Sequence, residues 1–536
     1  MKRVRSATDD SSPRNLAVLL LLAVLAFVVM GYHPGLEDDA FYLAAIKKNL
    51  NPALFPHDAD FFRLQFQATI FDKLIAFSVR LTHLPLAWAV LLWQLAAIFL
   101  LLHGCWRIAR RCFSDGAAQW AAVSLVAALL TLPVSGTGIF LADQYLHPRT
   151  LATAAVLAAV VAVIDCQLWL AGVLLAVAFS IHAIMAGFGV IFCAFLWWSL
   201  RASWRESTVV ATFLPLGIVI PFGWIFEPAS DAWRQAAATR SFYFVSRWAW
   251  YEWLGIFAPL ALLFALRCFL LRGAKIGDSD STGETAVLVP LVSSLICYGV
   301  FQTVVGLGIM LPPSLERLRP FEPMRYLHLL YLLFFQIVGG LLGQYVLRRH
   351  FYRWALLFVS LGAGMFYAQR EMFPATAHLE LPGVATQNSW LEAFEWIRQN
   401  TPVDSLFALN PRYVELPGED YHGFRALAER SVLADYVKDG GMAARVPRLA
   451  PRWLKEVQAQ SGWKNFQAAD FMRLREQFGV NWVILSRSDA LVSNAADVSA
   501  LISHAVMSGP VMSGRDQTGG ITCPHQNREL LVCRLY

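Results

Sequence analysis

Charged residues are scarce in this chain. They make up 15% of its 536 residues, whereas 57% are hydrophobic and the mean hydropathy is +0.49. Because soluble proteins carry roughly 25% charged residues, this composition excludes an ordinary soluble protein and predicts a membrane protein. The net charge of +6 is small for this length. It indicates that basic residues are concentrated in some of the loops, which sets the topology, rather than a nucleic-acid-binding surface.

Several chemical motifs are missing as well. The eight cysteines include no Cys-x-x-Cys pair and no Cys/His spacing typical of a metal site. No internal repeat is visible, and no glycine-rich nucleotide-binding loop occurs in the C-terminal region. Only Cys523 and Cys533 fall in the predicted exported domain. There a disulfide and two unpaired core thiols fit the sequence equally well.

Apolar runs long enough for membrane helices recur along the first 371 residues. We predict about eleven of them. They lie near 16–30, 85–104, 117–134, 150–164, 168–181, 183–199, 208–226, 253–271, 285–311, 325–347 and 354–370.

The connections between these runs are basic at alternate positions. Arginines follow at 107–111, 201–205, 267–272 and 348–353, which predicts a cytoplasmic N-terminus by the positive-inside rule. If residues 168–199 formed one helix instead of two, everything after them would be inverted. The later basic loops favour two helices.

The predicted fold is therefore an α-helical polytopic membrane protein with a C-terminal α/β extracytoplasmic domain. Residues 1–371 form the transmembrane domain, and residues 372–536 form the exported domain. The outer loop 31–84 carries two amphipathic stretches, Asp39–Asn49 and Asp60–Leu81. In the exported domain we predict helices at Trp390–Gln399 and Phe466–Phe478, and strands at Ser405–Leu409, Val480–Leu485 and Glu529–Leu535.

The strongest candidate for chemistry is the acidic start of the first outer loop. Glu37, Asp38 and Asp39 stand a few residues beyond the first apolar run. Acids so close to hydrocarbon lose solvation, which raises the pKa and suits a general base. They could also bind a divalent cation through oxygen ligands. The structural alternative is that Asp39 caps the helix that follows.

A second candidate lies at the mouth of a later run. Asp143, His147 and Arg149 fall within seven residues, next to Pro148. A helix-entry turn explains the proline but not the charges. His182, between two short runs, is either a packed or capping residue or a functional group at membrane depth.

Outer-loop arginines break the positive-inside pattern. They are candidates for binding the phosphate of a lipid-linked donor, because guanidinium groups match phosphate oxygens in two-pronged geometry. The alternative is headgroup contact and salt bridging with Glu316 and Glu322. The arginines are Arg240, Arg247, Arg317, Arg319 and Arg325.

The exported domain adds a further set of charges, most of which we expect on a solvated face. Some of them could instead close over the membrane cavity. They are Arg412, Arg425, Glu429, Arg430, Lys438 and Asp439.

With its acidic first loop, its helices of uneven length and its C-terminal outer domain, the chain resembles the GT-C class of integral-membrane glycosyltransferases. It is more closely similar to a bacterial family of uncharacterised GT-C-like membrane proteins, through Gly31–Phe62, Asp143–Thr150 and Trp390–Pro402. It lacks the Trp-Trp-Asp signature of oligosaccharyltransferases, so transfer of an oligosaccharide to asparagine is not implied.

This resemblance implies an inverting glycosyltransferase of the bacterial inner membrane. The donor would be a polyprenyl-phosphate-linked sugar, and the acceptor a glycan, lipid or protein. A first-loop acid would act as base or metal ligand, with Asp39 preferred to Asp38 as the base, and basic residues would hold the donor phosphate. Any divalent cation would bind at Asp38, Asp39 or Asp143. The alternatives are a transporter, a lipid-handling protein, or a non-catalytic envelope assembly protein.

Overall fold

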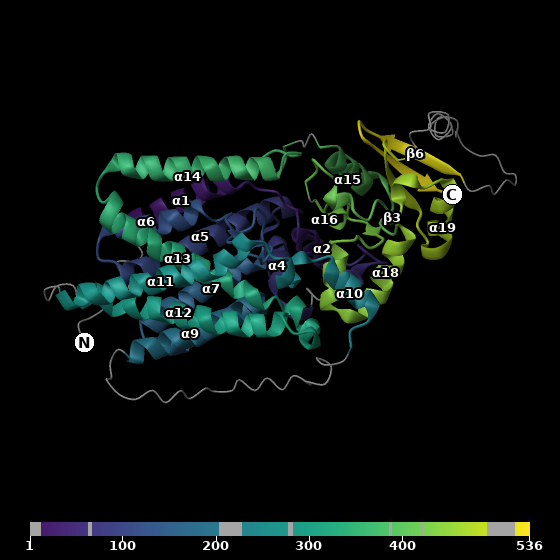
Figure 1. Ribbon diagram of the computed structural model, residues 1–536. Coiled ribbons are helices and arrows are strands. Elements are labelled where there is room, and N and C mark those ends of the chain that lie inside the picture. The colour runs from purple at the N-terminus through teal and green to yellow at the C-terminus, as the bar shows by residue number, and fades with distance from the viewer. Residues whose placement is uncertain are drawn as a thin grey trace. The chain divides into compact units, whose positions relative to one another are not determined.

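The computed structural model describes residues 12–62, 67–202, 228–276, 282–384, 388–420, 422–489 and 520–536 (Figure 1). The chain divides into two compact units. Unit 1 comprises Met1–Tyr32, Val90–Ala229 and Ser241–Glu371. Unit 2 comprises His33–Ala89, Ser230–Arg240 and Met372–Tyr536. Each unit is therefore assembled from segments that are far apart in the sequence.

Unit 1 is built mainly from long helices that run side by side (Figure 1). Helix α7 packs against α8 and α9, α6 packs against α13, and α12 packs against α9 and α11. The helices are α1 (Pro13–Met30), most of α5 (Leu86–Cys112), α6 (Gly116–Ala128), α7 (Pro148–Ile164), α8 (Leu168–Ile181), α9 (Ala183–Ala202), α11 (Trp250–Ile276), α12 (Thr282–Met310), α13 (Leu327–Leu342) and α14 (Phe351–Met372).

Shorter elements connect these helices. They are the two-stranded hairpin of β1 (Pro133–Val134) and β2 (Ile139–Phe140), the 3-10 helices η4 (Ser241–Tyr243), η5 (Val245–Arg247), η7 (Pro313–Phe321) and η8 (Pro323–Tyr326), and the π-helix η9 (Gly343–Leu347).

Seven described helices are long and apolar enough to cross a membrane, and α6, α7 and α8 are shorter apolar helices. Ten of the eleven predicted runs fall on helices, while the run 208–226 lies outside the described residues. The count of eleven spans is thus not established. In α14 the most apolar stretch has no buried residue, and in α11 only 17% of it is buried. Apolar side chains that face outward in this way are typical of multi-pass membrane proteins.

The apolar region 168–199 divides at His182. Helix α8 ends at Ile181, α9 begins at Ala183, and His182 between them adopts an extended conformation. Its Nδ1 atom accepts a hydrogen bond from the backbone N–H of Met185 at 3.4 Å. The structure therefore has two helices here, as the basic loops favour, and His182 caps the second of them.

Unit 2 contains a five-stranded mixed sheet in the order β4-β3-β5-β7-β6. Strands β4, β3 and β5 are parallel, whereas β7 runs antiparallel to β5 and β6. The strands are β3 (Leu406–Ala408), β4 (Ser431–Val432), β5 (Trp482–Ser486), β6 (Ile521–Gln526) and β7 (Leu530–Leu535).

Unit 2 also contains eight described α-helices. They are α2 (Asp39–Leu50), α4 (Phe71–Thr82), α10 (Asp231–Ala238), α15 (Ser389–Asn400), α16 (Phe424–Ala428), α17 (Lys438–Arg445), α18 (Ala450–Ala459) and α19 (Ala468–Phe478). Of these, α15, α16 and α19 contact the sheet. The 3-10 helices are η2 (Ala59–Phe61), η10 (Tyr413–Glu415), η11 (Pro447–Leu449) and η12 (Trp463–Asn465).

Strand β5 shows how the sheet is covered on both faces. Because successive side chains point to opposite faces, Trp482 and Ile484 pack in the cluster that contains α15. Val483 and Leu485 pack in the cluster that contains α19. The near-continuous apolar sequence of this strand follows from burial on both sides.

Local signals set the ends of the helices in unit 2. Asn388 Oδ1 accepts hydrogen bonds from the N–H groups of Trp390 at 2.9 Å and Leu391 at 3.0 Å, which caps α15. Gly479, with φ of +78°, ends α19 in the left-handed conformation that glycine adopts at low cost. The predicted helices and strands of residues 372–536 are confirmed. The stretch Asp60–Leu81 is not one continuous helix, since Thr69 and Ile70 lie outside any helix before α4 begins at Phe71; residues 63–66 lie outside the described residues.

Cys523 on β6 and Cys533 on β7 form a disulfide. The bond links two adjacent antiparallel strands at the C-terminal edge of the sheet. It resolves the two alternatives that the sequence leaves open.

Candidate functional site

The acidic first loop begins with a tight turn that buries Asp39. Its carboxylate is 1% exposed and accepts a hydrogen bond from the backbone N–H of Gly35 at 2.7 Å. Gly35 has a φ of +83°, and a Cβ atom there would lie 2.9 Å from the Leu427 side chain. Both constraints favour glycine. Asp39 thus begins α2 and holds the turn before it.

The other two acids of the loop are partly exposed and face a buried lysine. Glu37 bonds the Nζ atom of Lys438, which also lies 3.7 Å from an Oδ atom of Asp38. The side chain of Lys438 is 4% exposed, while those of Glu37 and Asp38 are 37% and 29% exposed. The arrangement offers two accessible carboxylates that could accept a proton or bind a cation.

The loop is fastened to a distant segment of unit 2. The N–H group of Gly423 donates a hydrogen bond to the carbonyl oxygen of Gly35 at 2.8 Å, and Leu36 forms an isolated antiparallel bridge with His422. A Cβ atom on Gly423 would lie 2.2 Å from that of Ala40. Only glycine allows this close approach, so the position of the acids depends on residues nearly 400 positions later.

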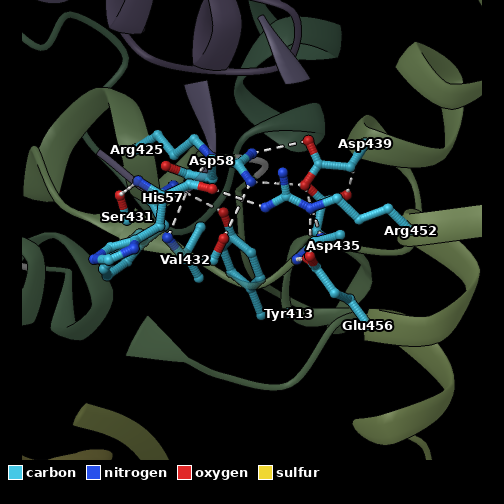
Figure 2. Close-up of polar contacts among 12 residues, drawn as sticks. His57, Asp58, Tyr413, Arg425, Ser431, Val432, Asp435, Asp439, Arg452 and Glu456 are labelled. Carbon is cyan, nitrogen blue, oxygen red and sulfur yellow. Dashed lines mark hydrogen bonds and ion pairs between the residues drawn. The ribbon is translucent and has the colours of Figure 1, made fainter. Parts of the chain in front are cut away.

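Behind the loop lies a buried ionic network around Arg425 (Figure 2). Its guanidinium bonds Asp58 and forms a two-pronged pair with Asp439, at 2.9 Å for each nitrogen–oxygen contact. Asp58 Oδ2 also accepts a hydrogen bond from the N–H group of Val432 at 3.0 Å. Burial disfavours the charged guanidinium, but the charges of Asp439 and Asp58 raise the pKa of Arg425 well above its usual value. The guanidinium of Arg425 therefore stays protonated, while burial raises the pKa of its partner Asp439.

Asp435 lies at the edge of this network and titrates unusually. Burial and the nearby charge of Asp439 raise its pKa to about 7. Its Oδ1 atom accepts hydrogen bonds from the N–H groups of Lys438 at 2.5 Å and Asp439 at 3.2 Å. A cavity of about 20 Å³ adjoins Asp435, Arg425 and Lys438. A cavity of this size holds a water molecule but not a sugar.

The expectation of a solvated face is wrong for four charges of the exported domain. Arg425, Arg430, Lys438 and Asp439 are each at most 5% exposed. Arg430 donates hydrogen bonds to Thr401 and to the carbonyl oxygen of Arg398, and the other three belong to the contacts above. Arg412 does lie on the surface, where its side chain is 52% exposed.

A second polar cluster in unit 2 has the composition of a metal site. His33, Glu380 and Asp420 each offer one ligand atom, and these three atoms lie within 4.8 Å of one another. Glu380 Oε1 contacts His33 Nδ1 at 2.7 Å and His422 Nε2 at 3.0 Å. Burial alone would raise the pKa of Glu380, but the charge of His422 and hydrogen bonds from both histidines lower it to about 2.

In unit 1 the predicted residues Asp143, His147, Arg149 and His182 come together. Arg149 forms two bonds to Asp143, at 2.5 and 2.6 Å, and both side chains are buried. His147 Nδ1 accepts a hydrogen bond from the N–H group of Arg149 at the start of α7, where Pro148 is the first helical residue. The rings of His147 and His182 are 6.2 Å apart between centroids. The turn that begins α7 and the charged side chains of Asp143 and Arg149 thus form one connected set of hydrogen bonds.

The predicted phosphate-binding arginines divide between the units. Arg247 and Arg319, in unit 1, both approach the ring of Phe244, at 4.7 and 5.2 Å from its centroid. Arg325 forms a buried pair with Glu322 at 2.5 Å, as in the salt-bridging alternative.

The two remaining arginines make other contacts. Arg317 donates a hydrogen bond to the carbonyl oxygen of Pro228 at 2.8 Å. Arg240 belongs to unit 2, where it packs against Gly441 of α17. The five arginines therefore do not act as one set. Arg247 and Arg319 share a contact with one aromatic ring, that of Phe244.

Sequence reasoning missed several residues of these clusters. His33 stands four residues before Glu37, and Asp58 belongs to a second acidic group, Asp58 and Asp60, that the sequence does show in the same loop, but the partners of both follow more than 340 residues later. His422 and Asp420 belong to no local motif. The one usable signal was the occurrence of histidines and acids in the first loop that local structure did not explain.

Comparison with known proteins adds a family match and a likeness to solved structures. A family model described as "Domain of unknown function (DUF6798)" matches residues 388–442. The search of curated proteins found no match. The fold is similar to that of an oligosaccharyltransferase from Archaeoglobus fulgidus, crystallised in complex with Zn and sulfate, at 11% identity and a TM-score of 0.42. The similarity covers 90% of this chain and 69% of that one. The family match spans α15, α16 and the start of α17, and so includes Asp420, His422, Arg425 and Lys438.

Proposed function

We propose that the chain is an inverting membrane glycosyltransferase that uses a polyprenyl-phosphate-linked sugar at the extracytoplasmic face. The observation that carries the proposal is the pair of partly exposed carboxylates, Glu37 and Asp38, next to the buried ammonium of Lys438. They follow the first apolar helix within eight residues. Ionised groups held at the end of a membrane span are functional candidates, because their placement is costly.

Asp38 is the best candidate for the base. Asp39 is buried and bonded to the Gly35 backbone, so an acceptor hydroxyl could reach it only after the turn opened. Asp38 directly precedes α2, its side chain is partly exposed, and it makes no capping hydrogen bond to the helix backbone. In this mechanism Asp38 takes the proton of the acceptor hydroxyl, whose oxygen forms the new bond to the anomeric carbon. The bond from that carbon to the phosphate oxygen breaks, and polyprenyl phosphate leaves with the electron pair.

Arg247 and Arg319 are the proposed ligands of the donor phosphate. Both guanidinium groups approach one aromatic ring, whose face favours a nearby cation. Burial lowers the pKa of Arg319, so the negative charge of the donor phosphodiester, which increases as polyprenyl phosphate leaves, would favour the protonated guanidinium at this position. Positive charge at the leaving oxygen stabilises the transition state. Arg325 already has Glu322 as its partner and would contribute less.

The buried set of Asp143, His147, Arg149 and His182 supports structure in this proposal. Its polar atoms bond one another and the entrance of α7, which keeps that helix end fixed. A divalent cation at Asp143 would have to displace both bonds from Arg149.

The decisive experiment compares Asp38→Asn with Asp404→Asn. Asp404 is an exposed aspartate of the same unit to which the proposal gives no role. The full chain, purified in detergent, is incubated with radiolabelled undecaprenyl-phosphate hexose and pentose donors, and release of undecaprenyl phosphate is measured. We expect Asp38→Asn to lose at least 100-fold in rate and Asp404→Asn to match the wild type.

Two results would overturn the proposal. Full activity of Asp38→Asn removes the base assignment. If the wild type releases no undecaprenyl phosphate from any donor, and a deletion strain accumulates no lipid-linked sugar, the transfer function itself is wrong. The assembly and transport alternatives would then take precedence.

A further inference from the structure

Five polar residues meet in a buried part of unit 2, and their contacts are separate from those of Glu37, Asp38 and Arg425 described above. They come from the start of the first loop, from the segment after α14 and from the segment before α16. They are His33, Thr376, Glu380, Asp420 and His422. The side chains of His33, Glu380 and His422 are at most 6% exposed, and Asp420 is 7% exposed.

The contacts within this cluster converge on Glu380. Its Oε1 atom lies 2.7 Å from His33 Nδ1, 2.8 Å from Thr376 Oγ1 and 3.0 Å from His422 Nε2. His422 Nε2 is also 3.1 Å from the other oxygen, Oε2. Thr376 Oγ1 bridges to Asp420 Oδ2 at 2.5 Å. Two imidazoles and two carboxylates thus occupy a space in which one small ion can reach three of them.

Hydrogen bonding alone does not satisfy these groups. His33 is fully buried, and among the described residues no hydrogen-bond partner lies within reach of its Nε2 atom. Leaving a buried polar atom unsatisfied is unfavourable. The ring nevertheless directs its other nitrogen, Nδ1, at Glu380 Oε1 and Thr376 Oγ1. The imidazole is therefore oriented with Nδ1 toward the cluster, where this nitrogen can serve as a ligand.

We infer that this cluster binds a divalent transition-metal ion of the Zn²⁺ class. His33, Glu380 and Asp420 supply the ligand atoms, and His422 positions Glu380. Imidazole nitrogen and carboxylate oxygen are the ligands that Zn²⁺ accepts, whereas Mg²⁺ and Ca²⁺ prefer oxygen alone. The ion would join residues up to 387 positions apart, because His33 lies that far from Asp420 in the sequence. It would hold the first loop against residues 376–422 whatever reaction the protein performs.

The first experiment measures metal content. The full chain, without a histidine tag, is purified in detergent, stripped with a chelator and dialysed against 10 µM Zn²⁺ or 10 µM Mg²⁺. We expect about one Zn²⁺ per wild-type chain by elemental mass spectrometry and no retained Mg²⁺. Asp420→Asn and His33→Gln should retain less than a fifth of the Zn²⁺. Glu419→Gln is the matched control, since Glu419 neighbours Asp420 but pairs with Asn388.

A second measurement covers variants that fold poorly. Co²⁺ replaces Zn²⁺ in the stripped protein, and the visible absorption between 500 and 650 nm reports its ligands. We expect bands from a nitrogen–oxygen site in the wild type, bands at altered wavelengths in His422→Gln, and none in Asp420→Asn. Thermal unfolding should shift upward by several degrees with Zn²⁺ only where metal is retained. Each of these readouts is independent of glycosyl transfer.

Three outcomes would overturn the inference. These are less than 0.1 Zn²⁺ per wild-type chain, equal retention in Asp420→Asn and the wild type, and Co²⁺ bands that persist when both His33 and Asp420 are replaced. In any of these cases the cluster is a buried ion-pair network and no more.

Discussion

Each unit contains a buried arginine paired with aspartate, and the two arrangements differ in how far apart the partners lie. In unit 1, Arg149 pairs with Asp143 six positions earlier. In unit 2, Arg425 pairs with Asp58, 367 positions earlier, and with Asp439, 14 positions later. The near pair lies within one turn at the entrance of a helix. The distant pair joins segments that share no local structure.

This difference teaches what each pair does for the fold. A near pair fixes the geometry of its own turn, and the chain brings its partners together at little entropic cost. A distant pair can form only after long segments have docked, since closing a long loop costs conformational entropy. The buried network of Arg425 therefore depends on the assembled unit and helps to hold it together.

Replacing Arg425 should have the largest effect. Arg425→Met leaves two buried aspartates without their cation, and breaking a buried pair typically costs about 3–5 kcal/mol. We expect unit 2 to lose cooperative unfolding or to unfold at least 10 °C earlier. Tryptophan fluorescence during heating and hydrogen exchange of unit 2 peptides would measure this. Arg412→Met, on the surface, should leave both the unfolding temperature and the hydrogen exchange of unit 2 unchanged. If Arg425→Met and Arg412→Met gave the same unfolding temperature, the distant pair would not be important for stability.

Breaking the near pair should cost less. Asp143→Asn removes the carboxylate that accepts two bonds from Arg149, yet only one charge is left without its partner. We expect destabilisation of about 2–3 kcal/mol, confined to the region around α7. Hydrogen exchange should rise at the start of α7 and stay unchanged in unit 2. A loss as large as that of Arg425→Met would remove the distinction between near and distant pairs.

Asp435 tests the charge balance inside the distant network. Because the pKa of its carboxyl group is raised to about 7 in the folded state, the folded protein binds a proton that the unfolded chain has released above pH 4. Stability therefore falls as the pH rises from 4 to 7. Asp435→Asn keeps the Oδ1 acceptor but removes the charge. It should stabilise the protein by on the order of 2 kcal/mol above pH 7, and by nothing near pH 4.

Melting temperatures of Asp435→Asn and the wild type, taken from pH 4 to pH 8, would measure this difference. A difference that stays constant across the range would mean that Asp435 is ionised throughout.

The smallest effect is expected from a local contact within unit 2. Asn388→Ala removes the cap of α15, which costs about 1 kcal/mol for such residues. Asn400→Ala, at the exposed end of the same helix, should cost less. Urea unfolding would show a lower midpoint for Asn388→Ala with an unchanged slope. If Asn388→Ala destabilised unit 2 as much as Arg425→Met does, local contacts would matter as much for its stability as the buried distant pair.

Much of the fold could be predicted because its signals are local. Apolar runs identify the helices of unit 1, and the break at His182 follows from the basic loops on either side. Asn388 and Gly479 mark the ends of α15 and α19 in the sequence itself. Even the near pair was visible, since Asp143, His147 and Arg149 lie within seven residues.

The candidate sites could be predicted only in part. The acids of the first loop were found, but not that Asp39 is buried and Asp38 exposed, because Lys438 and Gly423 determine this from far along the chain. Arg425 and Lys438 look like surface charges until Asp58 and Glu37 are placed beside them. A single sequence gives no information on which distant charges will meet.

The discontinuous composition of unit 2 has a consequence for synthesis. Its first segment, His33–Ala89, is made early, whereas Gly423, Arg425 and Lys438 emerge more than 330 residues later. At 5–20 residues per second the ribosome needs on the order of half a minute to supply them. Throughout that interval the nascent chain exposes Asp58 and the acids of the first loop without the cations that later neutralise them. A ribosome that stalls before residue 420 would leave unit 2 without these cations, and quality-control proteases could recognise such a chain by its uncovered first loop.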